Sequence, residues 1–241
     1  MPKAPNINKN NVSEKERVLE LAKRDIISFG QLFLPEDFMK STPAAYHYEL
    51  NDLLLDDSKK RNCIILPRGH SKSTLAKTAL LYHLYFNPEG KKEFIAWVAE
   101  EQGQSIDHVK YIRSHLETNQ AIRYYFGNLC GGDIGKRWTE KDLITTKGHR
   151  IIAKGTSQRL RGRAEVDTRY TGIILDDFES ELNTKTAIRR DEIKQWIVST
   201  VYPSLEESPG KEGWIWLSGT IVHYDAFLSV GCNLHSCYRR W

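Results

Sequence analysis

Residues 65–74, with the sequence ILPRGHSKST, place a lysine and hydroxyl side chains directly after an apolar run. In the usual phosphate-binding loop, G-x-x-x-x-G-K-[ST], backbone amides surround the phosphates, the lysine reaches the β- and γ-phosphates and the hydroxyl holds Mg²⁺. Lys72 and Ser73 fit, whereas Leu66 and Ser71 occupy the two glycine positions. A helix N-terminus favours a phosphate even without those glycines, because its free amides and dipole remain. An ordinary strand–turn–helix junction with a solvated lysine is the alternative.

On the first interpretation, this loop binds ATP together with Mg²⁺. Arg68 adds a positive charge at the tip of the loop, where it would contact the γ-phosphate or sense its loss. With Lys72 it would stabilise charge on the phosphates, so both are candidate catalytic residues, while Ser73 is a candidate metal ligand. The expected nucleotide-binding residues of the loop are Pro67, Arg68, Gly69, His70, Ser71, Lys72, Ser73 and Thr74.

The second set of chemical residues is in GIILDDFES, residues 172–180. Two adjacent carboxylates after a buried strand cost stability unless they are used, because like charges repel. In phosphate-loop enzymes this position holds an Asp that helps to bind Mg²⁺, followed by a residue that activates the attacking water. We therefore predict that Asp176 holds the metal and that Asp177 is the base. Glu179 is a second candidate for the base, and a solvated turn residue is the alternative for it.

The third set is the arginines of KGTSQRLRGRAEVD, residues 154–167, which alternate around Gly162. An arginine, from the same chain or a neighbouring subunit, neutralises charge in phosphoryl transfer, and Arg161 and Arg163 are the candidates. Contact with DNA phosphates and plain solubility are the alternatives. Residues 136–170 hold ten Lys/Arg against four Asp/Glu, which suits phosphate or nucleic acid but also a solvated face.

The fourth set follows the last buried strand, in LSGTIVHYDAF, residues 217–227. Polar residues at a strand end would reach the γ-phosphate and report its hydrolysis to a moving element. Ser218, Gly219 and Thr220 are expected in this role. His223 and Asp225 are expected to be local hydrogen-bond partners, not metal ligands.

Strands and helices alternate along the chain, which predicts an α/β fold with a mostly parallel central sheet and helices on both faces, preceded by an N-terminal helical segment. Ligands bind such sheets at the carboxyl ends of the strands, where all four sets lie. Strands are expected at 62–66, 94–99, 171–175 and 214–219, with two short ones in 143–155 joined at 147–148; helices are expected at 14–33, 43–55, 72–86, 104–118 and 191–202.

Composition excludes little. The chain has 241 residues, 40% hydrophobic and 27% charged, with a net charge of +4, as in ordinary soluble globular proteins. We expect a soluble intracellular protein, because no apolar run is long enough for a membrane span and the first residues lack the apolar core of a signal peptide.

The four sets, in this order, resemble the ATPase domain of the phage terminase large subunit over residues 43–228. The resemblance implies a three-layer P-loop NTPase of the ASCE type, in which the loop glycines are commonly replaced and an Arg precedes the Lys. It also implies that Asp176 and Asp177 form the Walker B pair, and that Tyr46 and His47, in PAAYHYELNDLL, contact adenine. Better known relatives have Glu where this chain has Asp177, so the identity of the base stays open.

The resemblance further implies a DNA-packaging motor that translocates double-stranded DNA. Its expected partners are the portal protein, the terminase small subunit and further copies of itself in a ring, and its expected location is the bacterial host cytoplasm and, transiently, the prohead portal. The segments expected are 1–42 as a disordered start and helical segment, 43–228 as the ATPase domain and 229–241 as a tail. The nuclease domain of the family, and hence nuclease activity, is not expected in these residues.

Two other interpretations remain open at this point. One is another nucleic-acid-dependent ATPase, such as a helicase or transposition ATPase, with the same core. The other is a nucleotide-binding scaffold that does not hydrolyse.

Overall fold

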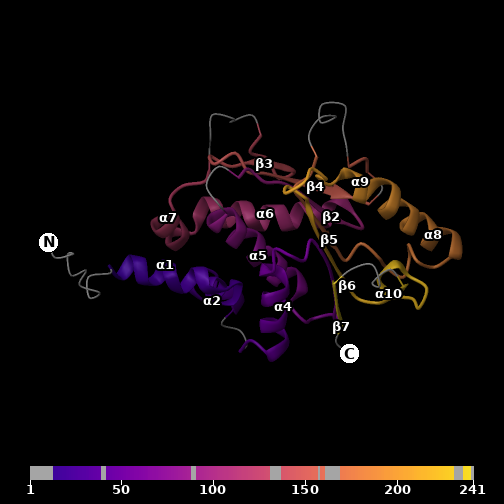
Figure 1. Ribbon diagram of the computed structural model, residues 1–241, viewed down its shortest axis with the longest axis horizontal. Helices are drawn as coiled ribbons and strands as arrows, with labels where there is room; N and C mark the ends of the chain where they lie inside the picture. Colours follow the sequence, from indigo (N-terminus) through magenta and orange to yellow (C-terminus); the bar gives the residue numbers. More distant parts are fainter. Residues whose placement is uncertain are drawn as a thin grey trace, which may run out of the picture.

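The computed structural model of the chain describes residues 13–38, 42–87, 91–130, 137–156, 158–160, 169–230 and 236–239. One central sheet runs through the molecule, and helices lie on both of its sides (Figure 1).

Within the described residues, the sheet contains seven strands in the order β3-β4-β2-β5-β6-β1-β7. Every neighbouring pair is parallel except β3 and β4, which form an antiparallel hairpin. The strands are β1 (Arg61–Ile65), β2 (Phe94–Ala99), β3 (Asp142–Ile144), β4 (Arg150–Gly155), β5 (Gly172–Asp176), β6 (Trp214–Gly219) and β7 (Ser236–Arg239). One strand, β6, lies between β1 and β5. The predicted α/β fold with a mostly parallel sheet is therefore confirmed.

Burial on both faces explains why these segments form strands. All residues of β2 and β5 are buried, and such continuous apolar runs are typical of parallel strands covered on both sides. Side chains of successive residues enter two separate cores, since Ile174 packs with one cluster and Ile173 and Leu175 with the other.

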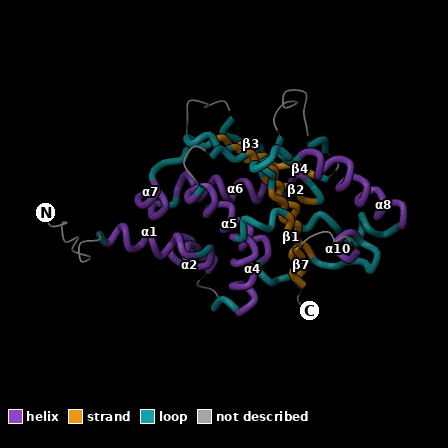
Figure 2. The backbone as a smooth tube through the Cα atoms, viewed as in Figure 1, coloured by secondary structure: helices purple, strands orange, loops and turns teal. Residues whose placement is uncertain are grey.

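The first core lies under the larger helical layer. This layer comprises α1 (Glu14–Arg24), α2 (Ile26–Phe33), α3 (Pro35–Phe38), α4 (Ala45–Leu55), α5 (Lys72–Phe86), α6 (Gln102–Thr118) and α7 (Gln120–Phe126). The opposite face is covered by α8 (Ala187–Trp196), a π-helical turn η2 (Ile197–Val201), α9 (Tyr202–Ser204) and α10 (Phe227–Val230). Figure 2 shows these two helical layers with the strands between them.

Local capping accounts for most differences from the predicted elements. The helix expected at 14–33 is two helices, because Asp25 has an extended backbone and its carboxylate accepts the Ser28 amide at 2.6 Å to begin α2. Thr186 likewise caps α8, which begins at Ala187, four residues before the predicted start at Asp191. Helix α7, which was not predicted, begins where Asn119 accepts the Ile122 amide at 3.0 Å.

Strand β7 comes from the segment 229–241, for which no element was predicted, and it pairs in parallel with β1. Within the part of the chain that the structure describes, no helix is long and apolar enough to span a membrane.

Candidate active site

The loop between β1 and α5 turns through left-handed backbone conformations, although both glycines of the usual motif are replaced. Ser71 adopts the left-handed conformation, with φ 57°, and Gly69 also has a positive φ of 79°. Ser71 is the N-cap of α5, and among the described residues its side chain makes no capping hydrogen bond. The first amides of this 15-residue helix therefore lie at the carboxyl edge of the sheet without a side-chain cap, as an anion site requires.

Lys72 is buried at the base of this loop. Its Nζ donates to the carbonyl oxygens of Leu66 and Pro67, both at 3.1 Å, and to the hydroxyl of Thr220 at 3.2 Å. Burial lowers the pKa of Lys72 below its usual value, and the carboxylates of Asp177 and Asp176 offset only part of this shift. The predicted phosphate-binding lysine and the predicted coupling threonine thus lie side by side.

Asp176 ends β5 and pairs in register with Ser218 at the end of β6. The Ser218 hydroxyl donates to Asp176 Oδ1, and the carboxylate is only 1% exposed. Asp176 Oδ2 has no hydrogen-bond partner among the described residues. A buried carboxylate oxygen without a donor is costly, and a metal or its water ligand would satisfy it.

Asp177 turns the chain sharply after β5. Its φ is 45°, a left-handed conformation that Asp tolerates better than most residues, and its amide donates to the Ser218 carbonyl at 3.0 Å. Although the Asp177 side chain is exposed at the surface, partial loss of water raises the pKa of its carboxyl group, and the Asp176 charge raises it further. The charges of Lys72 and Arg68 act in the opposite direction. A raised pKa suits a group that accepts a proton from water.

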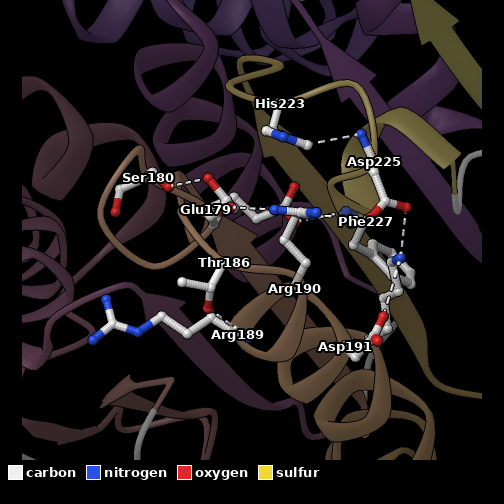
Figure 3. A network of polar contacts seen from close by, with 11 residues as sticks. Glu179, Ser180, Thr186, Arg189, Arg190, Asp191, His223, Asp225 and Phe227 are labelled. Carbon is white, nitrogen blue, oxygen red and sulfur yellow. Dashed lines mark hydrogen bonds and ion pairs between the residues drawn. The ribbon is translucent and has the colours of Figure 1, made fainter.

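Glu179 is not a solvated turn residue, so that alternative is wrong. The residue is 5% exposed, and its carboxylate accepts the amides of Phe227 at 2.7 Å and Leu228 at 2.9 Å, at the start of α10 (Figure 3). The sequence did not reveal this role because the two amides lie almost 50 residues further along the chain. With both oxygens bound to backbone amides, Glu179 suits a structural role better than that of a base.

The segment after β6 is fixed to α8 by a polar network, also seen in Figure 3. The Asp225 carboxylate binds Arg190 Nε at 3.0 Å and Lys194 Nζ at 2.9 Å. Its backbone amide donates to His223 Nδ1 at 3.0 Å. His223 and Asp225 are therefore local hydrogen-bond partners, as predicted.

Arg161 and Arg163 lie outside the described residues, so their catalytic role stays a prediction. The segment that leads to them contacts the site through Glu100, which follows β2. The backbone carbonyl of Glu100 accepts a hydrogen bond from the Thr156 hydroxyl at 3.1 Å, and its carboxylate accepts one from the Ser180 hydroxyl at 2.6 Å. Glu100, which sequence reasoning missed, thus joins the chain after the acidic pair to the start of the arginine segment.

Tyr46 and His47 lie close to the loop, as the adenine-contact prediction requires. The ring centroid of Tyr46 is 4.0 Å from that of His47 and 5.8 Å from that of His70. His47 also lines a small pocket of about 40 Å³ with Ser71 and Thr74. Since an adenine ring needs more space, its placement here stays a prediction.

Among the described residues no group of three or more His, Cys, Asp or Glu side chains is arranged to hold a metal.

Comparison with known proteins finds neither a matching family model nor a matching curated protein. The crystal structure of the HK97 bacteriophage large terminase is similar, with a TM-score of 0.53 and 16% identity over 92% of this chain. This chain spans 41% of that terminase. The expected resemblance to the terminase large subunit is thereby confirmed at the level of the fold.

Two structures of the Thermus phage P74-26 large terminase ATPase domain, one of them a mutant, also align. The mutant has a TM-score of 0.45 and 12% identity, covering 82% of this chain and 71% of that one. The other has a TM-score of 0.44 and 13% identity, covering 79% and 67%.

Proposed function

We propose that this chain is a Mg²⁺-dependent ATPase that powers the translocation of double-stranded viral DNA into a prohead. The observation that carries the proposal is the meeting of three strand ends. Lys72, in the loop after β1, the carboxylate pair at the end of β5 and residues Ser218–Thr220 at the end of β6 are linked by hydrogen bonds at a single edge of the sheet. The terminase-like fold supports the choice of a packaging motor over other P-loop ATPases.

The residues fit a magnesium nucleotide. Asp176 provides a buried carboxylate whose Oδ2 has no hydrogen-bond partner among the described residues, and the adjacent Asp177 adds a second negative charge that a cation would relieve. Ser73 and Asp176 would hold Mg²⁺, which neutralises charge on the phosphates. Because Lys72 is bound by neutral acceptors, its ammonium can exchange a carbonyl for a phosphate oxygen with little rearrangement.

In hydrolysis, Asp177 would orient a water molecule and accept its proton. Arg68 is exposed at the tip of the loop and would contact the γ-phosphate. An arginine from 159–163, in the same chain or a neighbour, would complete the charge stabilisation. The loop amides and Lys72 would hold the β- and γ-phosphates in line for the attack.

The proposed partners follow from the terminase-like fold. They are double-stranded DNA, a portal protein, a terminase small subunit and further copies of the chain in a ring, and the proposed location is the host cytoplasm and the prohead portal. We propose a division into a helical segment to residue 42, an ATPase domain over 43–228 and a C-terminal segment from 229, which adds β7 to the sheet of that domain.

The test is steady-state ATP hydrolysis with Mg²⁺, measured against protein concentration and with added DNA and portal. We expect turnover that requires Mg²⁺ and is lost in Lys72→Ala. A flat rate near zero, even with DNA and portal, would favour a nucleotide-binding scaffold. Turnover that is stimulated by DNA without ends or portal would favour a helicase-like ATPase.

A further inference from the structure

A histidine on α6 lies against the buried end of the Asp176 carboxylate. His108 Nε2 is 3.4 Å from Asp176 Oδ2, slightly longer than a hydrogen bond, and this is the oxygen that lacks a hydrogen-bond partner among the described residues. The His108 side chain is 23% exposed, so it approaches the carboxylate from the edge of the site, not from within the core.

The ring of His108 is held in place by Trp97 of β2. The two rings stack with centroids 4.8 Å apart and planes 28° from parallel. Trp97 is fully buried, and its indole Nε1 has no hydrogen-bond partner among the described residues. An unpaired buried N–H costs about 1 to 3 kcal/mol, so a smaller apolar ring would be cheaper here if filling space were the only requirement. The indole of Trp97 is explained if its role is to provide a flat, fixed surface on which the imidazole of His108 stacks.

Helix α6 itself is fixed relative to the sheet. At its beginning the Ser105 hydroxyl donates to the Lys154 carbonyl of β4 at 2.6 Å, and Gln102 Nε2 donates to the Ala153 carbonyl at 3.2 Å. Its buried residues Val109 and Ile112 pack in the same core as Trp97. The distance between His108 and Asp176 is therefore set by packed elements and not by a mobile loop.

The Asp176 carboxylate thus has a neighbour at each oxygen, the Ser218 hydroxyl at Oδ1 and His108 at Oδ2. We propose that His108 is a positioning residue for the metal-binding carboxylate: its imidazole limits rotation of Asp176 and keeps Oδ2 oriented for Mg²⁺ on the nucleotide. This inference rests on the proposed function. Outer-shell partners of metal ligands act in this way, and their loss typically costs 10- to 100-fold in metal affinity.

The experiment measures binding rather than turnover. A non-hydrolysable ATP analogue is titrated into the full chain by calorimetry, once with Mg²⁺ and once with EDTA, and the ratio of the two dissociation constants gives the gain in affinity due to the metal. His108→Leu keeps an apolar side chain of similar length on Trp97 but removes the nitrogen. His108→Gln keeps an N–H donor. His115→Leu is the matched control, since His115 lies two turns further along α6 and contacts Tyr111 and Asn119 instead.

We expect His108→Leu to reduce the metal-dependent gain about tenfold and to leave the affinity in EDTA unchanged. His108→Gln should recover most of the gain, and His115→Leu should keep all of it. The proposal would be wrong if wild type and His108→Leu showed the same metal-dependent gain in affinity, or if His108→Leu and His115→Leu lost the same part of it. In either case His108 would have a packing role only. If the wild type itself shows no gain with Mg²⁺, the proposed nucleotide site fails and the positioning role fails with it.

Discussion

Lys72 donates a hydrogen bond to the hydroxyl of Thr220 across 3.2 Å, although 148 residues separate them in the chain. The same hydroxyl donates to the Leu66 carbonyl at 2.9 Å, so Thr220 contacts both the lysine and the strand end of the phosphate loop. Further along, the segment after Thr220 is fixed to α8 through Asp225. A displacement of Lys72 toward a phosphate therefore changes the contacts of a segment that is linked to the opposite face of the sheet.

Removing the Thr220 hydroxyl should weaken this link. Thr220→Val has nearly the same shape, so we expect nucleotide affinity within a few-fold of wild type but kcat about tenfold lower, because one hydrogen bond to a charged group contributes about 1.5 kcal/mol or more. Parallel measurements of nucleotide Kd and kcat check this. Thr220→Ser keeps the hydroxyl and should behave as wild type. Equal kcat in all three proteins would exclude a coupling role for this residue.

Neutralising Asp177 should increase stability while reducing activity. Partial loss of water and the Asp176 charge raise the pKa of Asp177 in the folded chain above its value in the unfolded chain. The folded state therefore holds this proton more tightly, and the associated stability is present at low pH and lost as the pH rises through the folded-state pKa. At neutral pH the ionised Asp177 destabilises the fold, so Asp177→Asn should raise Tm there and have little effect once the pH is below the unfolded-state pKa of an aspartate, about 4.

A control variant and a second measurement test this prediction further. Asp225 has the opposite environment, since Lys194 and Arg190 lower its pKa, so Asp225→Asn should lower Tm at neutral pH and lose that effect as the pH falls. Removing a general base costs about 10²- to 10⁴-fold in rate, and Asp177→Asn should show such a loss in kcat with nucleotide binding retained. An unchanged kcat would remove Asp177 from the chemistry, whatever its effect on Tm.

Substitutions of Ser71, which stands at the second glycine position of the usual motif, test whether the loop needs a left-handed residue there. The left-handed conformation at Ser71 is strained for a residue with a Cβ and especially for a β-branched one. We expect Ser71→Gly to unfold in urea within about 1 kcal/mol of wild type, because relief of strain and greater freedom of the unfolded chain oppose each other. Ser71→Val should lose about 1 to 3 kcal/mol. Equal stability of the three proteins would mean that the loop does not need this conformation.

Local patterns predicted the parts of the site that depend on one segment of chain. The run from β1 into α5 and the acids after β5 were predictable because strand, turn and helix signals surround Lys72 and Asp176 directly. The parallel sheet then brings those strand ends to one edge, so the meeting of Asp176 with Ser218 also followed from the fold.

The rest depends on contacts between distant segments. His108 looks like any histidine on a partly polar helix, and its place beside Asp176 depends on how α6 packs against β2. The left-handed conformation of Ser71 could not be predicted, because Ser is common at helix N-caps, where the backbone is usually extended. Glu179 looks like a solvated residue among other polar ones, since its partners belong to α10, which is only four residues long and has little sequence signal.

The last prediction separates the two acids proposed as the base. Glu179 accepts two backbone amides at the start of α10, so Glu179→Ala would leave both without their acceptor and should cost roughly 2 to 5 kcal/mol in urea unfolding. Glu179→Gln keeps one acceptor oxygen and should cost less. Because the Glu179 carboxylate is hydrogen-bonded to backbone amides, we expect the rate constant of single-turnover hydrolysis in Glu179→Gln to stay within a few-fold of wild type, in contrast to Asp177→Asn. A loss of 100-fold or more in Glu179→Gln, with Tm close to wild type, would instead identify Glu179 as the base and leave Asp177 as a residue that shapes the turn after β5.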